Sequence, residues 1–220
     1  METVKIGSQS WVSENLATFK FRNGDEFPIV DNFEDWVKYS SKGLPCCAYV
    51  DNKKSMAKYG LFYNGFCATD SRDICPEGYR LPMIQDILNL TDYLGFKNSN
   101  KESIYYNEDV GCGLKSTKTW KKSFFGKPGD NSTGMNFLAG GNLTVREGMF
   151  LFDDRGFTAN HWLKNEHVPG PEVKFFPAPP EDWPKERLHQ FSLGTGGDNS
   201  LGITDNFRVR GAFIRLIKED

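Results

Sequence analysis

The sequence has no apolar run near the roughly 18 residues that a membrane-spanning helix needs, so we expect no span of that kind. Its Lys and Arg residues never run longer than two in a row. The basic stripe typical of nucleic-acid binding is therefore missing, and we expect no nucleic-acid partner. The first residues also lack the basic-then-apolar pattern of a signal peptide. These absences leave the compartment unknown.

Cysteine pairs of the CxxC type are absent as well, which argues against structural zinc. The five cysteines are Cys46, Cys47, Cys67, Cys75 and Cys112. An odd number leaves at least one thiol free, and free thiols fit a reducing compartment. One or two disulfides among the five stay open as an alternative.

Aromatic residues, in contrast, are abundant: 18 Phe, 8 Tyr and 5 Trp occur among 220 residues. Each buries roughly 150–250 Å², so the chain can build a large core. Trp11, Trp120 and Trp162 lie in strand-like aromatic contexts, and we interpret them as core residues. Because no internal repeat or linker divides the sequence, we predict a single domain over residues 1–220.

Two segments carry helical signals. Residues 31–42 predict a short helix capped by Asp31 or Asn32. After Leu81, apolar residues recur at the spacing of one buried helical face. Pro82 suits the start of that second helix, and Gly95 suits the position just beyond its end.

The remaining segments are assigned from alternation and from turn residues. They comprise two short strands within 4–12, extended core segments at 46–50 and 59–68, an exposed loop at 97–109, short strands with tight turns over 135–162, a Pro-rich irregular loop at 165–185 and a final strand at 207–217.

Six motifs, in the same order along the chain, resemble those of the Fibrobacter succinogenes major paralogous domain family. They are Ile6-Gly7-Ser8-Gln9-Ser10-Trp11, Tyr59-Gly60-Leu61-Phe62-Tyr63-Asn64, Cys75-Pro76-Glu77-Gly78-Tyr79-Arg80-Leu81-Pro82, Leu114-Lys115-Ser116 with Trp120, Gly134-Met135-Asn136-Phe137-Leu138-Ala139-Gly140-Gly141, and Gly211-Ala212-Phe213-Ile214-Arg215-Leu216.

The resemblance implies a C-type-lectin-like α+β fold, with one or two helices, short twisted antiparallel strands and long loops. It also implies that the chain ends meet as neighbouring strands, Val4–Ile6 beside Phe213–Ile217. The family is associated with bacterial surface and secreted proteins, so the resemblance implies an extracellular or cell-surface location. Leu216 stands where the family pattern has a terminal cysteine, which removes the partner that the resemblance would imply for Cys75.

Catalytic signals are weak. Related sulfatase-modifying enzymes use a reactive cysteine pair late in the chain, and no cysteine follows Cys112 here. His161, His167 and His189 lie 6 and 22 residues apart, which matches no helical metal face, so we interpret them as isolated polar residues. The segment 194–197 lacks the GK[ST] ending of a phosphate loop and is interpreted as a flexible turn.

Acidic and amide residues cluster at 153–154, 182, 198–199 and 205–206, and calcium takes oxygen ligands of this kind. The spacing matches no EF-hand, and the triplets of calcium-binding lectins are missing. We interpret these residues as solvated turns and expect no cofactor, with calcium as the alternative.

We therefore predict a non-catalytic recognition module, of the bacterial adhesin or phage receptor-binding type. It would bind a cell-surface protein or glycan through an irregular loop half at about 142–206, with Trp183 as an aromatic anchor. A structural subunit of a surface or virion assembly and an enzyme with an unrecognised site are the alternatives. The candidate ligand-binding residues are Arg155, Asn160, Trp183, His189, Asp198 and Asn199.

Overall fold

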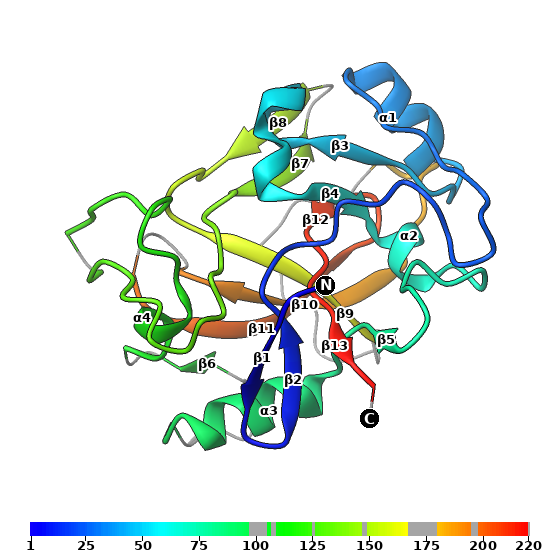
Figure 1. Cartoon of the computed structure of the whole chain (residues 1–220). Coiled ribbons are helices and arrows are strands. Elements are labelled where there is room, and N and C mark those ends of the chain that lie inside the picture. The colour runs from blue at the N-terminus through cyan, green and yellow to red at the C-terminus, as the bar shows by residue number, and fades with distance from the viewer. Residues whose placement is uncertain are drawn as a thin grey trace.

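The computed structural model describes residues 1–96, 105–106, 109–124, 126–146, 149–166, 180–194 and 198–219 (Figure 1). Within them, helices accompany three sheets whose ladders are antiparallel. The α+β class is confirmed, and the C-type-lectin-like architecture stays a prediction. No helix in this described part is long and apolar enough to cross a membrane.

The two ends of the chain meet in one sheet. Its order is β1 (Thr3–Ile6), β2 (Gln9–Val12), β13 (Ile217–Lys218) and β5 (Tyr79–Arg80). The predicted direct pairing of Val4–Ile6 with Phe213–Ile217 is wrong. β2 lies between β1 and β13, and Ile217 of β13 pairs with Trp11 of β2. β2 is buried along most of its length whereas β1 is largely exposed, as expected for an inner strand and an edge strand.

Both predicted helices are confirmed. α1 spans Phe33–Ser40, and Asn32 caps it by accepting a hydrogen bond from the Asp35 N–H at 2.8 Å. α3 spans Ile84–Tyr93, and Gly95 follows it with a φ of 87°. The short elements were not predicted: α2 (Gly65–Thr69) lies largely within the segment expected to be extended, and the others are α4 (Val110–Leu114) and the 3₁₀ helices η1 (Val50–Asn52) and η2 (Lys54–Tyr59).

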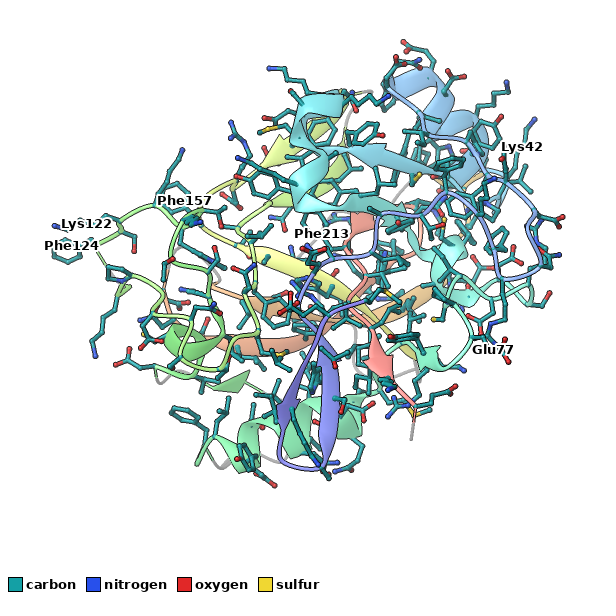
Figure 2. All side chains as sticks on the ribbon, viewed as in Figure 1. Lys42, Glu77, Lys122, Phe124, Phe157 and Phe213 are labelled. Atoms are coloured by element: carbon teal, nitrogen blue, oxygen red, sulfur yellow. The ribbon has the colours of Figure 1, made fainter. Side chains whose placement is uncertain are left out.

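A five-stranded sheet forms the upper part of the molecule in Figure 1. Its order is β3 (Cys47–Tyr49), β4 (Leu61–Asn64), β12 (Gly211–Ala212), β7 (Asn142–Arg146) and β8 (Met149–Asp153). Just after β12, Phe213 is fully buried and stacks on Phe62 with ring centroids 4.2 Å apart. Figure 2 shows Phe213 near the centre of the molecule, where it anchors the C-terminal segment.

The third sheet corrects the prediction of an irregular half at about 142–206. Its order is β6 (Tyr105–Tyr106), β11 (Leu201–Phe207), β10 (Arg187–Leu193) and β9 (Ala159–Glu166). β9, β10 and β11 have seven or eight residues each and are the longest described strands. β6 likewise falls inside the predicted loop at 97–109. Residues 167–179 of the predicted Pro-rich loop and 195–197 of the predicted turn lie outside the described residues.

Buried apolar side chains fill the space between these sheets in three clusters. Trp11 and Trp162 are fully buried, as the core interpretation requires, and Trp120 is half-buried. All five cysteines are free, and burial raises the pKa of the Cys46 thiol to about 12. Leu216 belongs to the same buried cluster as Cys75, so an apolar side chain stands where the resemblance places a second cysteine.

Candidate functional site: an amide-lined cleft

The sheet of β9, β10 and β11 has two chemically different faces. Successive side chains of a strand point to opposite faces. Phe191 and Leu193 of β10 join the apolar core, together with Leu201 of β11. Gln190 and Ser192 therefore point the other way; Gln190 pairs with Thr204 of β11 and Trp162 of β9, and Ser192 pairs with Asn160 of β9. Trp162 on this second face packs in another apolar cluster, so amide and hydroxyl side chains occupy only part of the face.

A cleft of about 200 Å³ opens on this face, against the inner strands β7 and β12 of the five-stranded sheet. In Figure 1, β9 to β11 lie below β7 and β12, which supply the opposite wall. We call it the amide-lined cleft. Most of its lining side chains are neutral hydrogen-bonding groups; the lining residues are Asn142, Leu143, Thr144, Asp154, Thr158, Asn160, Gln190, Ser192, Thr204, Asn206, Arg210 and Gly211.

Three largely buried side chains of this cleft have no hydrogen-bond partner among the described residues. Asn160, Gln190 and Ser192 are only 8%, 5% and 8% exposed. Within the described residues, their side chains make no hydrogen bond to the protein, and their polar atoms are not among the completely enclosed ones. These atoms must therefore reach the open space of the cleft. Their hydrogen-bonding atoms are thus left available to a ligand that enters the cleft.

Other groups that line the cleft already make hydrogen bonds within the protein. Thr158 Oγ1 donates to the Leu193 carbonyl at 3.1 Å, and Asn142 Nδ2 donates to Asp154 Oδ2 at 3.2 Å. Asp154 and Arg210 are the two ionisable side chains among the described lining residues, and they have opposite charges. No cysteine or histidine lines the cleft there. The cleft can therefore offer many hydrogen-bond donors and acceptors but no paired nucleophile and base.

Of the six candidate residues predicted from the sequence, Asn160 alone lines the cleft. Arg155 follows β8 and pairs with Asp51 through atoms 3.0 Å apart. Trp183 is half-buried and donates its backbone N–H to the Pro180 carbonyl at 3.0 Å. His189 is half-buried on β10, opposite Asp205. The structure therefore does not bring these residues together into one site.

Asp198 and Asn199 have a structural role that the ligand-binding prediction missed. The ammonium group of Lys115 donates to the Asp198 carbonyl and, at 2.8 Å, to Asn199 Oδ1. The same ammonium lies 4.3 Å from the centroid of the Trp120 ring. The Leu114-Lys115-Ser116 motif with its Trp120 thus fixes the turn that leads into β11.

Sequence reasoning missed Gln190, Ser192, Thr204 and Asn206. A signal was present for β10: at 190–193, amide or hydroxyl residues alternate with apolar ones. Reading residues 142–206 as irregular concealed this two-residue period. Arg210 had no such signal, because only the fold brings it to the cleft.

On the opposite face of β9, His161 belongs to a buried polar group. Its Nε2 lies 3.0 Å from Asn15 Oδ1, which also accepts from Arg215 Nε at 3.0 Å. Since that oxygen can only accept, His161 Nε2 carries the proton. The ring also stacks on Phe191 at 4.8 Å. The interpretation of His161 as an isolated polar residue is therefore wrong; it is a fully buried part of the core.

This burial predicts an acid-dependent loss of stability. Burial, and next the positive charge of Arg215, lower the pKa of His161 well below its ordinary value. Below about pH 6.5 the unfolded chain therefore binds a proton that the folded chain does not. The free energy of unfolding should fall as the pH drops below that value, by up to about 1.4 kcal/mol per pH unit. Urea denaturation between about pH 7.5 and 5 measures this slope, and His161→Phe should reduce it; equal slopes would contradict the prediction.

The described residues bring no three His, Cys, Asp or Glu side chains together in a group that could hold a metal ion. The fold and the cleft define the class: an α+β domain of three antiparallel sheets with an amide-lined cleft between two of them. The chain belongs to the Fibrobacter succinogenes major domain family, whose model matches residues 4–194. Comparison with curated proteins and with solved structures gave no match.

Proposed function

We propose that this domain is a non-catalytic recognition module that binds its ligand in the amide-lined cleft. The observation that carries the proposal is that the largely buried side chains of Asn160, Gln190 and Ser192 make no hydrogen bond to the part of the chain that the structure describes. A ligand with hydrogen-bond donors and acceptors can pair directly with these groups. Rigid strands hold these groups in place, which lowers the entropy lost on binding.

The chemistry of the cleft favours binding over catalysis. Among the described lining residues, Ser192 has no histidine or carboxylate partner that would activate its hydroxyl. Four of the five cysteines are buried, and burial raises the pKa of the partly exposed Cys112 as well. Thiolate chemistry at neutral pH is therefore disfavoured. The lectin-like architecture and the cell-surface setting of the family resemblance belong to the same proposal, in which the ligand is a surface protein or glycan.

The test is a screen of the labelled chain against arrays of glycans and of surface proteins, with and without calcium. Any ligand found is then titrated against Asn160→Ala/Gln190→Ala. We expect the double variant to lose at least about tenfold in affinity, since two hydrogen bonds disappear. The matched control is Asn89→Ala/Gln85→Ala, the same two substitutions on the exposed face of α3.

Two results would overturn the proposal. One is a ligand that binds the double variant and the unmodified chain equally well, which would place the binding site elsewhere. The other is an array without any binder together with stoichiometric labelling of one residue by a nucleophile probe, which would favour an enzyme. Thermal unfolding of each variant checks that it has folded before its affinity is measured.

A further inference from the structure

We infer that the amide-lined cleft selects a neutral, hydroxyl-rich ligand, a single sugar ring at the end of a glycan, and holds it by direct hydrogen bonds without a metal ion. This inference rests on the proposed function and adds the chemical class of the ligand. It follows from the type of polar groups, their charge balance, the size of the cleft and the position of the cleft on the sheet.

The polar groups of the cleft match hydroxyl groups. Each amide of Asn160 and Gln190 both donates and accepts, and so does the Ser192 hydroxyl. A sugar hydroxyl does the same, so it pairs with such a group in either direction. A carboxylate or phosphate only accepts and an ammonium only donates, so a charged ligand would leave part of the lining unmatched.

The charged residues support a neutral ligand. Among the described lining residues, Asp154 and Arg210 are the ionisable ones and their charges cancel. An anion would be attracted by Arg210 and repelled by Asp154, and a cation the reverse, so this pair of residues gives neither sign of charge an advantage. With a single carboxylate in this lining, the recognition we infer uses amide and hydroxyl contacts and should resist removal of calcium.

Size and position argue for a ring rather than a peptide strand. The volume of about 200 Å³ lies below the roughly 300–1,000 Å³ of pockets for drug-sized ligands, so the cleft accepts one small unit. An extended peptide adds to a free sheet edge, whereas β10 is already paired with β9 and β11 on both sides. One amide side chain of a protein ligand offers at most about four hydrogen bonds, fewer than a sugar ring with several hydroxyls.

The experiment uses saturation-transfer NMR and titration of the full chain with methyl glycosides of glucose, galactose, mannose and N-acetylglucosamine. Their charged counterparts are methyl glucuronide and methyl glucosaminide. At least one neutral glycoside should bind. The affinity for the charged analogue of the same ring should be lower by at least about tenfold. EDTA should change the affinity by less than about twofold.

Two variants connect the binding to the cleft. Gln190→Ala should lower the affinity for the neutral glycoside about fivefold to tenfold, because one hydrogen bond is lost. Gln190→Glu keeps the shape and replaces a donor with an acceptor, so it should weaken binding even if the alanine variant proves less stable. Gln85→Ala, an exposed glutamine on α3, should leave the affinity unchanged.

The outcomes separate the two claims. Binding restricted to charged glycosides, or binding that EDTA abolishes, would overturn the inference. A peptide or protein ligand that Gln190→Ala weakens, with no glycoside bound, would overturn the inference and leave the proposed function standing. A ligand whose affinity neither Gln190 variant changes would overturn both.

Discussion

Replacing Arg215 with alanine is expected to lower the free energy of unfolding by about 3–5 kcal/mol. The guanidinium is fully buried between the apolar clusters. It donates to the Val12 carbonyl at 3.1 Å, to the Met135 carbonyl at 3.0 Å and to Asn15 Oδ1. Alanine would leave these three acceptors short of a donor and would open a cavity beside the Phe137 ring, which the guanidinium covers at 4.4 Å.

The size of this effect comes from burial rather than from charge alone. Burial lowers the pKa of Arg215 to about 9, which still leaves it protonated at neutral pH. The matched control is Arg155→Ala, because Arg155 pairs with Asp51 where its side chain is 42% exposed. An exposed ion pair contributes about 0–1 kcal/mol. Urea denaturation of both variants measures the contrast, and a loss below about 1 kcal/mol for Arg215→Ala would contradict the prediction.

The elements that the sequence predicted correctly depend on local signals. α1 begins where Asn32 can cap it, and α3 ends where Gly95 adopts a positive φ. Both features lie within a few residues of the element they define. The same holds for the hairpin of β1 and β2, whose turn contains Gly7 with a φ of 59°.

The elements that were missed depend on contacts between distant residues. β10 contains Ser192, and β11 contains Gly202, Asp205 and Asn206, residue types that also favour turns, so only their pairing settles these segments as strands. In the same way, Asn15 and His161 are 146 residues apart in sequence but share a hydrogen bond. No local pattern shows which polar residues such pairing will bury.

The candidate site was missed for a related reason. Asp198 and Asn199 look like solvated loop residues in the sequence, and the fold uses them to bind Lys115. Gln190 looks like one polar position in a strand, and the fold leaves its side chain largely buried with no hydrogen bond to any residue that the structure describes. Exposure to a ligand is thus a property of the assembled sheets rather than of residue type.

The Gly140-Gly141 pair shows how a sequence motif can define the wall of the cleft, and it gives the second large prediction. Gly141 has a φ of 85°, and a Cβ there would lie 2.2 Å from the Asp153 carbonyl oxygen and 2.8 Å from the Arg155 backbone nitrogen. Backbone cannot rotate away as a side chain can. Gly141→Ala should therefore lower the free energy of unfolding by more than about 3 kcal/mol, because the strained φ and the clash act together.

Gly78→Ala is the matched control for this prediction. Gly78 has a φ of 77°, and a Cβ there would meet no atom within 4 Å. Gly78→Ala should lower the free energy of unfolding only through the unfavourable positive φ, by about 1–2 kcal/mol. The difference between the two variants in urea denaturation isolates the clash, and equal losses would contradict this account of Gly141.

The clash at position 141 should also change the shape of the amide-lined cleft. Residues 153–155 must move to make room for the new Cβ, and Asp154 in that segment lines the cleft and accepts a hydrogen bond from Asn142. Gly141→Ala should therefore weaken ligand binding at temperatures where the variant is still folded, whereas Gly78→Ala should not. Because Gly141 has no side chain of its own to offer a ligand, such a loss would show that the glycine acts by shaping the wall.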